Sequence, residues 1–116
     1  MIGIDLVHIS KFVAVVESKR GAHSLRMIFS DAEMLESGGD GIVSMRSLAG
    51  RFAIKEAIIK ASSLDLGLDD MLRIRIMESA SGRLYAVAEK VGFAPERFCV
   101  TLSHDGDYAI AVVIRE

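Results

Sequence analysis

The stretch LAGRFAIKEAIIKA, residues 48–61, has the composition of a helix that is packed on most of its circumference. Small and apolar residues fill every turn and leave only a narrow arc for polar side chains. We therefore expect a long helix over about 43–62, entered from a glycine-containing loop at 38–41. Within the quoted stretch the charged residues are three cations and one carboxylate: Arg51, Lys55, Lys60 and Glu56.

Helical geometry divides these charged residues between two stripes. Glu56 and Lys60 are four residues apart and share one stripe, whereas Arg51 and Lys55 lie about 100° round the helix from it. An ordinary surface ion pair beside two solubilising cations would explain the pattern, with a stabilisation on the order of a few tenths of a kcal/mol. A bound anion such as a phosphate would also explain it, because like charges four residues apart repel one another. Spacing alone leaves both interpretations open.

The residues before this helix predict one strand and two helical segments. Residues 2–9 alternate as a strand does, which places Asp5 on an otherwise apolar face with Gly3, Val7 and Ile9. Ser10 is a candidate N-cap for the following helix, which breaks near Gly21. The sequence SDAE at 30–33 matches the capping box that opens a short helix over about 31–37.

The residues after the long helix predict most of a sheet. Leucine and isoleucine alternate with arginine over 72–76, as in a strand with one wet side, and SASG at 79–82 reads as a turn. Residues 84–91 fit a short helix. The segment 98–114 reads as two strands around a turn at Asp105 and Gly106, and this hairpin closes the sheet.

Composition and length narrow the class of protein. The 116 residues suit a single domain, 1–116, and 51% hydrophobic residues with 26% charged ones indicate a globular chain. A net charge of −2 disfavours nucleic-acid binding, which needs a broad basic face. The chain shows neither a signal peptide nor a membrane-spanning run, so we expect a cytoplasmic protein. Cys99 stands among apolar residues and is expected to be a buried thiol.

Three further residues carry candidate chemistry. Asp5 could cap a neighbouring helix, or it could meet Glu56 to form a pair of carboxylates suited to Mg²⁺ on a pyrophosphate. Ser103 and His104 stand where a strand enters its turn, a place from which side chains either face solvent or reach a ligand. The three histidines show no spacing typical of a zinc site.

Three segments together resemble the holo-acyl-carrier-protein synthase family, the small bacterial 4'-phosphopantetheinyl transferases. They are GIDLVHI at 3–9, LAGRFAIKEAIIKA at 48–61 and VTLSHDGDYAIAVVI at 100–114, in the order and spacing of the family. The resemblance implies an α+β fold, with a small antiparallel sheet packed against the long motif helix and shorter helices. It also implies an enzyme that transfers phosphopantetheine from coenzyme A to a serine of apo acyl carrier protein, with Mg²⁺, releasing adenosine 3',5'-bisphosphate.

The resemblance assigns roles to the positions that match its motifs. By this pattern Asp5 and Glu56 hold the Mg²⁺, Glu56 helps to deprotonate the attacking serine, and Lys60 steadies the charge on the phosphates. The residues expected to line the nucleotide are Arg51, Lys55, Ser103 and His104, together with Lys60. Three cations would then meet a polyphosphate, and one carboxylate would meet its metal.

The family further implies a homotrimer with sites between subunits, in fatty-acid or polyketide-type synthesis. Its protein substrate is an acidic carrier, which basic residues on and after the first helix dock; here that patch is Lys11, Lys19, Arg20 and Arg26.

Some positions depart from the family. His8 replaces a usual glutamate, SSLDLG at 62–67 replaces a GTG loop, and GRL after the turn replaces GKP. A non-catalytic module that binds coenzyme A or a carrier protein with the same fold is the alternative, although such a module has no need of both Asp5 and Glu56.

Overall fold

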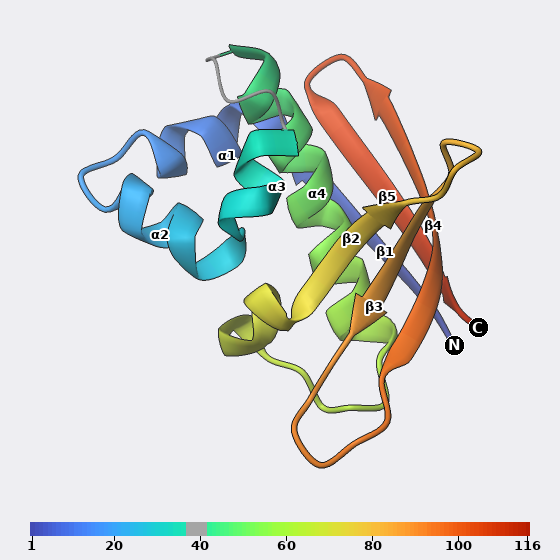
Figure 1. Cartoon of the computed structure of the whole chain (residues 1–116). Helices are drawn as coiled ribbons and strands as arrows, with labels where there is room; N and C mark the ends of the chain where they lie inside the picture. The colour runs from blue at the N-terminus through green and yellow to red at the C-terminus, as the bar shows by residue number, and fades with distance from the viewer. Residues whose placement is uncertain (37–41) are drawn as a thin grey trace.

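The computed structural model describes residues 1–36 and 42–116 (Figure 1). Within these ranges, one antiparallel sheet has the strand order β1-β5-β4-β3-β2. Its strands are β1 (Ile2–His8), β2 (Ile74–Glu78), β3 (Leu84–Ala88), β4 (Glu96–Asp105) and β5 (Tyr108–Arg115). The helices are α1 (Ile9–Val16), α2 (Gly21–Ile28), α3 (Asp31–Glu36), α4 (Ile42–Ala61) and the 3-10 helix η1 (Leu68–Arg73). The described helices include none whose length and apolarity would let it span a membrane.

Helix α4 crosses one face of the sheet, and α1, α2 and α3 gather on the side of α4 that lies away from the β4–β5 hairpin (Figure 1). The contact between α4 and β1 is close enough to exclude a side chain. A Cβ atom built on Gly3 would lie 2.0 Å from the carbonyl oxygen of Ala57. Gly3 of β1 and the small residues of α4 therefore allow close contact between the two backbones. This contact fixes where the polar side chains of β1 and α4 lie relative to one another.

The short helices are tied to α4 by the ammonium of Lys55, whose side chain is 0% exposed. Lys55 Nζ donates to Oε1 of Glu33 at 2.8 Å and to the carbonyl oxygens of Ile28 at 2.6 Å and Met71 at 2.9 Å. The N–H of Ser30 also donates to Glu33, and the N–H of Glu33 donates to the Ser30 hydroxyl. This reciprocal pair confirms the predicted capping box, and one buried cation joins α2, α3, α4 and η1.

The sequence placed the long helix, the first strand and the final hairpin correctly. The turn of the hairpin falls at Gly106 and Asp107, one residue later than expected, with a φ of 57° at Gly106. The predicted glycine loop at 38–41 lies outside the described residues.

Two expectations about secondary structure were wrong. Residues 84–91 do not form a helix, since Leu84–Ala88 is strand β3 and pairs with β2 and β4. Its buried alanines alternate with partly exposed neighbours, and a run this short fits both periods. Ser10 is not the N-cap of α1, because Nδ1 of His8 accepts the N–H of Lys11 at 3.2 Å and takes that role.

Cys99 is exposed rather than buried. It lies on the face of the sheet that α4 does not cover, and its thiol donates to the Glu116 carboxylate at 3.1 Å. The hydrogen bond to that carboxylate, more than burial, raises the pKa of the Cys99 thiol. The apolar residues around Cys99 in the sequence suggested a core position, but some of these apolar residues lie on the outer face of the sheet as well.

That outer face is apolar along β1 and β5. Ile2, Ile4 and Leu6 are 68%, 54% and 60% exposed, and they pair in register with the outward side chains of β5, namely Ile114, Val112 and Ile110. An antiparallel sheet that faces water on one side usually alternates apolar and polar residues. This half of the sheet is apolar on both faces.

Candidate functional site

A cluster of one cation and two carboxylates forms where β1 passes the last turns of α4. Nζ of Lys60 lies 3.0 Å from Oδ1 of Asp5 and 2.9 Å from the carbonyl oxygen of Ile4. Glu56, one turn before Lys60 on α4, is close enough to Asp5 for their charges to interact. Asp5, Glu56 and Lys60 are therefore within electrostatic reach of one another on one side of the helix.

The protonation of Glu56 reflects this crowding. Partial burial raises the pKa of the Glu56 carboxyl above its ordinary value, and the negative charge of Asp5 raises it further. The ammonium of Lys60 opposes both effects without cancelling them. A carboxylate that holds its proton more tightly is a better proton acceptor, and it would also gain from a nearby divalent cation.

The donor set fits Mg²⁺ better than a metal that needs a full protein cage. The described ranges contain no group of three or more His, Cys, Asp or Glu side chains that could enclose an ion. Mg²⁺ is commonly held by one or two carboxylates, with phosphates and water completing its octahedron. Asp5 and Glu56 supply such a pair.

Lys55 does not belong to this cluster, contrary to the expectation that it lines a nucleotide. Its ammonium has three acceptors in Glu33, Ile28 and Met71, so no N–H is left for a phosphate. Burial lowers the pKa of Lys55, while the Glu33 carboxylate opposes that shift. Lys55, which the helical spacing places on a polar stripe, therefore has a structural role in the interior.

Arg51 lies on another side of the helix. It is nine residues before Lys60, which at about 100° per residue puts the two side chains on opposite sides of α4. Nη2 of Arg51 is 3.2 Å from Oε2 of Glu36, and Nη1 is buried and has no hydrogen-bond partner among the residues that the structure describes. The three cations of the motif therefore do not converge within one chain.

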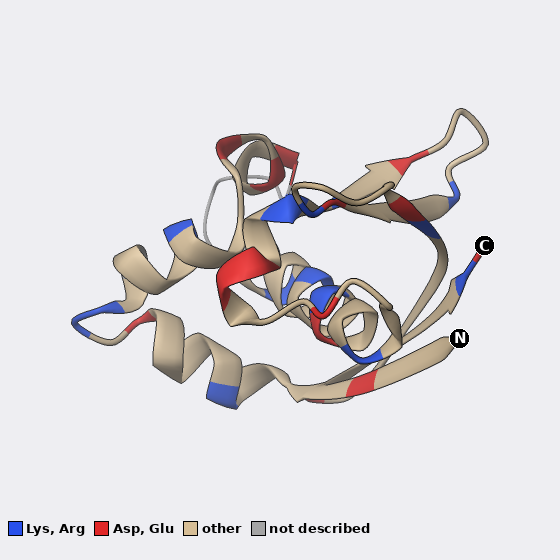
Figure 2. Ribbon diagram, turned by 90° about the horizontal axis from the view of Figure 1, so that it is seen from below, with Lys and Arg blue, Asp and Glu red and all other residues tan. Residues whose placement is uncertain are grey.

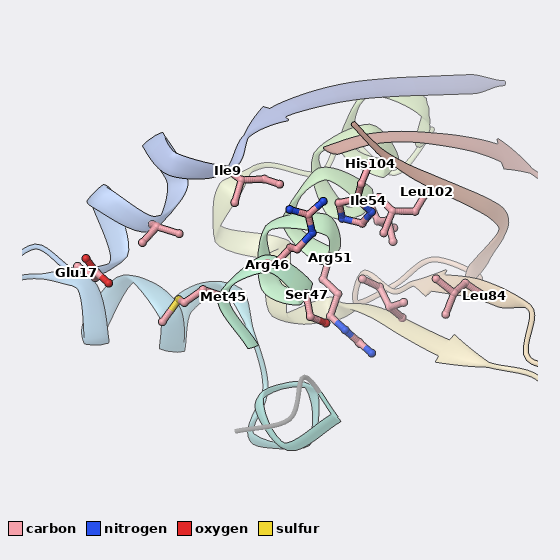
Figure 3. A pocket seen from close by; sticks show the side chains of 12 residues that line it. Ile9, Glu17, Met45, Arg46, Ser47, Arg51, Ile54, Leu84, Leu102 and His104 are labelled. Atoms are coloured by element: carbon pink, nitrogen blue, oxygen red, sulfur yellow. The ribbon is translucent and has the colours of Figure 1, made fainter. Parts of the chain in front are cut away.

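Arg51 instead borders a cavity of about 800 Å³ between α4, α1 and the inner face of the sheet (Figure 3). His104 lines the same cavity from β4, so these two predicted residues share a site. Arg46 and Ser47 also line it, and no pattern in the sequence pointed to them. Asp5, Glu56 and Lys60 are absent from the lining, so the candidate residues form two separate groups, the Lys60 cluster of these three residues and the cavity.

Ser103 is not in the cavity. Neighbouring residues of a strand point to opposite faces, so Ser103 faces outward with its register partner Ile110 while His104 faces inward. His8, the departure from the family, is engaged at the other end of β1. Its Nε2 lies 3.3 Å from Oδ2 of Asp107, and its ring packs edge-on against Tyr108.

The predicted basic patch is exposed as a whole. Figure 2 shows basic residues on α1, on α2 and in the turn between them. The four members of the patch are Lys11, Lys19, Arg20 and Arg26. A cavity of about 320 Å³, lined mostly by apolar side chains of α1 and α2, lies beside Lys11.

Comparison with known proteins identifies a family. Residues 1–113 match the 4'-phosphopantetheinyl transferase superfamily. A holo-[acyl-carrier-protein] synthase of Nocardia farcinica is 35% identical over 99% of this chain and 86% of that protein. A protein of the same name from Nautilia profundicola is 32% identical over 98% and 97% of the two chains.

Solved structures resemble the fold along its whole length. The Helicobacter pylori holo-[acyl-carrier-protein] synthase in complex with coenzyme A is 28% identical, with a TM-score of 0.79 and full coverage of both chains. The Chronobacterium ammoniagenes ACPS-CoA complex is 25% identical, also with a TM-score of 0.79, over 100% of this chain and 96% of that chain. The relatives found by sequence and those found by structure are therefore the same kind of protein, holo-[acyl-carrier-protein] synthases.

Proposed function

Because this chain belongs to the 4'-phosphopantetheinyl transferase superfamily, we propose that it transfers the 4'-phosphopantetheine group of coenzyme A to a serine of an apo acyl carrier protein. The serine oxygen attacks the phosphorus that carries the pantetheine, and a new P–O bond forms. The P–O bond to the nucleotide breaks, and adenosine 3',5'-bisphosphate leaves. The observation that carries this proposal is the cluster of Asp5, Glu56 and Lys60 at the contact of β1 and α4.

Asp5 and Glu56 are the residues that would hold Mg²⁺. When bound, the metal neutralises charge on the diphosphate and so favours departure of the nucleotide. The chemistry of the donor set supports this assignment, since two neighbouring carboxylates match the protein share of a magnesium site. Burial is the main cause of the raised Glu56 pKa and repulsion by Asp5 is the second, and a cation between the two carboxylates would relieve that repulsion.

Glu56 is also the proton acceptor for the serine hydroxyl. Burial, and then the charge of Asp5, raise its pKa, which makes Glu56 a stronger base than an ordinary carboxylate. Lys60 supplies a positive charge beside the same carboxylates, and its side chain is 53% exposed, so it can turn toward a phosphate. An ammonium placed there stabilises the charge that develops on the leaving phosphate.

We assign the apolar outer face of β1 and β5 to contacts between subunits of a homotrimer. Large apolar side chains such as Ile2, Ile4 and Leu6 are exposed together on this face, and contiguous exposed apolar surface is typical of a protein interface. The separation of the Lys60 cluster from the cavity supports a site shared between subunits. The metal-binding cluster of one chain would face the Arg51 and His104 cavity of another, so that each coenzyme A contacts both.

The carrier protein would dock on α1 and α2. Their four exposed basic residues, the basic patch, suit an acidic partner, and the neighbouring apolar cavity suits an apolar side chain at the centre of that contact. Holo carrier protein is the product, so the enzyme would serve fatty-acid or polyketide synthesis in the cytoplasm.

The test is mass spectrometry of apo acyl carrier protein incubated with coenzyme A, Mg²⁺ and this protein. We expect a mass gain of one phosphopantetheine group, which Asp5→Asn and Glu56→Gln abolish. Asp69→Asn, a change of an exposed carboxylate on η1, is the matched control and should retain the gain. No gain with several fatty-acid and polyketide carriers would replace this proposal with the non-catalytic binding module.

A further inference from the structure

The two serines that follow α4 are held by one carboxylate of β4. Oε1 of Glu96 accepts a 2.5 Å hydrogen bond from the Ser62 hydroxyl, and Oε2 accepts one of the same length from the Ser63 hydroxyl. The backbone N–H of Ser63 also donates to Oε1, at 3.2 Å. Figure 1 shows the end of α4 beside the start of β4. A single side chain of the sheet therefore contacts both residues that come directly after Ala61, where α4 ends.

Glu96 is itself fixed in place by the sheet. It lies two residues before Phe98 on β4, so it shares the inner face with that buried side chain. Arg115 of β5 is the register partner of Phe98, and its Nη1 donates to Oε2 of Glu96 at 2.7 Å. Burial alone would raise the pKa of the Glu96 carboxyl, but hydrogen bonds from the two serines and Arg115 outweigh burial and lower that pKa. The side chain is only 10% exposed, so a charged carboxylate is held between β4, β5 and the end of α4.

This carboxylate takes the place of an ordinary helix cap. Helices often end with a glycine in the left-handed conformation, which turns the chain out of the helix. The residues after Ala61 are Ser62, Ser63 and Leu64, and none of these three has a positive φ. Glu96 instead draws the chain out of α4 toward β4. Because helix ends fray, removal of the carboxylate should loosen the last turn of α4.

Lys60 lies in that last turn, two residues before Ser62. Its ammonium reaches β1 at Ile4 and Asp5, and its side chain is 53% exposed, so packing does little to hold it. The end of α4 is thus tied to β1 by Lys60, and to β4 and β5 by Glu96. Both ties attach to residues 60–63, so the place of the ammonium depends on the carboxylate.

Resting on the proposed function, we propose that Glu96 is a positioning residue: it holds the end of α4 so that Lys60 stays at Asp5 and meets the charge on the leaving phosphate. Glu96 acts through Lys60 and not on a substrate. A misplacement of about 1 Å can cost a reaction about 100-fold in rate, so a loosened last turn is enough to impair transfer. The segment SSLDLG at 62–67 is one of the departures from the family, and Glu96 explains how this chain ends α4 with two serines there.

Steady-state kinetics of two variants and a control tests the proposal. Glu96→Ala should lower kcat by about 10-fold or more and change KM for coenzyme A and for the carrier by less than about 2-fold. Glu96→Gln should recover most of the rate, because its amide oxygen still accepts from Arg115 and its N–H can donate to a serine hydroxyl. Glu89→Ala, which removes a carboxylate that pairs with Arg75 elsewhere on the sheet, is the matched control and should retain the full rate.

Two further measurements separate positioning from a loss of stability. Added to Lys60→Gln, Glu96→Ala should lower kcat by less than about a further 2-fold, because the ammonium that it positions is already gone. Without coenzyme A, Glu96→Ala should strengthen Mg²⁺ binding by about 2-fold or more, because an ammonium displaced from Asp5 no longer opposes the metal. A residue that only stabilises the fold would lower kcat by the same factor in both backgrounds and would not improve metal binding. If Glu96→Ala does not fold, Ser62→Ala combined with Ser63→Ala removes the same hydroxyl contacts and carries the same expectations.

The proposal is overturned if Glu96→Ala keeps the full kcat, or if it lowers kcat equally with and without Lys60. When the unmodified enzyme transfers phosphopantetheine, either result shows that only the role of Glu96 is wrong. An unmodified protein that modifies no carrier would remove the proposed function instead. The Mg²⁺ titration then still decides whether Glu96 holds Lys60 at Asp5, and an unchanged affinity for the metal in Glu96→Ala would overturn that link as well.

Discussion

The ammonium of Lys60 donates a 3.0 Å hydrogen bond to the Asp5 carboxylate, and a 2.9 Å bond to the carbonyl oxygen of Ile4 next to it. Strand β1 therefore delivers a backbone acceptor and a side-chain acceptor to one cation of α4. Asp5 is also one of the two proposed metal carboxylates, so a bound divalent cation would compete with Lys60 for the Asp5 oxygens until a phosphate accepted the ammonium.

This competition predicts opposite effects of Lys60→Gln on metal binding and on turnover. Loss of the ammonium should strengthen Mg²⁺ binding in the absence of coenzyme A by roughly 3-fold to 10-fold, because Asp5 loses a neighbouring positive charge. It should lower kcat by about 100-fold or more, because the charge on the leaving phosphate loses its partner. Metal titration and steady-state kinetics measure the two effects. Lys90→Gln, at another partly exposed lysine, is the control, and equal losses in kcat and in affinity for coenzyme A would contradict the role given to Lys60.

Glu56 should contribute to activity at a cost in stability that depends on pH. Its pKa is raised in the folded state, mainly by burial and then by Asp5, so folding favours the protonated carboxyl. Below the pKa of an unfolded glutamate the carboxyl is protonated in both states, and the folded protein keeps its full stability. As pH rises through the folded pKa, the carboxyl ionises at an unfavourable position and this stability is lost. We therefore expect Glu56→Gln to be inactive yet to unfold at a higher temperature than the unmodified protein at neutral pH. The difference should vanish on acidification below the ordinary carboxyl range, and a lower melting temperature of the variant at neutral pH would refute the account.

The buried ion pair of Lys55 and Glu33 leads to a third prediction, which concerns the free energy of unfolding and not activity. Lys55→Met leaves the Glu33 carboxylate buried without its cation, which should cost about 3 to 5 kcal/mol of the free energy of unfolding. Adding Glu33→Gln removes the stranded charge while keeping an acceptor for Ser30, so the double variant should be more stable than Lys55→Met. Lys60→Met, at a largely exposed lysine, should change stability by less than about 1 kcal/mol. Denaturant unfolding of these variants measures the coupling, and a double variant that is less stable than Lys55→Met would show that the charge is not the cause.

The basic patch predicts an effect on one substrate only. Changing Lys11 and Arg26 together to glutamate should raise KM for an acidic carrier protein by about 10-fold or more, because two attractions become repulsions. The KM for coenzyme A should stay within a factor of about 2, since neither residue lines the Arg46 cavity. Arg75→Glu together with Arg83→Glu, at two exposed positions outside the basic patch, makes the same change of charge and is the control. A similar rise in KM for both substrates would place the patch at the nucleotide instead.

The sequence was informative where a pattern repeats over many residues. Small and apolar residues at every turn of 48–61 predicted α4, and alternation over 2–9 placed Asp5 on the strand face that meets Glu56. Both results follow from local geometry, since a side chain's direction in a helix or strand depends on its position in the repeat. The pairing of Asp5 with Glu56 needed the fold to bring two distant segments together, and the resemblance to a family supplied that step.

Where the sequence failed, the missing information was tertiary. Lys55 looks like a surface cation because its acceptors, Glu33 and two backbone carbonyls, belong to segments far from it in the chain. Cys99 looked buried because apolar residues of β4 and β5 also line an outer face that this chain leaves uncovered. Arg46 gave no signal in the sequence, and its place on the wall of the cavity becomes visible only when α4 and β4 lie together.

The apolar outer face of the sheet yields the last prediction. Ile4 is 54% exposed on β1 at the middle of that face, beside its register partner Val112. A charge placed there would be buried in the proposed trimer without a partner, so Ile4→Lys should dissociate the assembly. Light scattering coupled to size-exclusion chromatography should then report a monomer, and transfer to the carrier should fall by at least about 100-fold, because the Lys60 cluster loses the cavity of its neighbour. Val91→Lys, at an 82% exposed position in the β3–β4 loop, should leave both mass and activity unchanged. An Ile4→Lys monomer that kept full activity would show that each chain completes its own site, and an unmodified protein that runs as a monomer would remove the interface altogether.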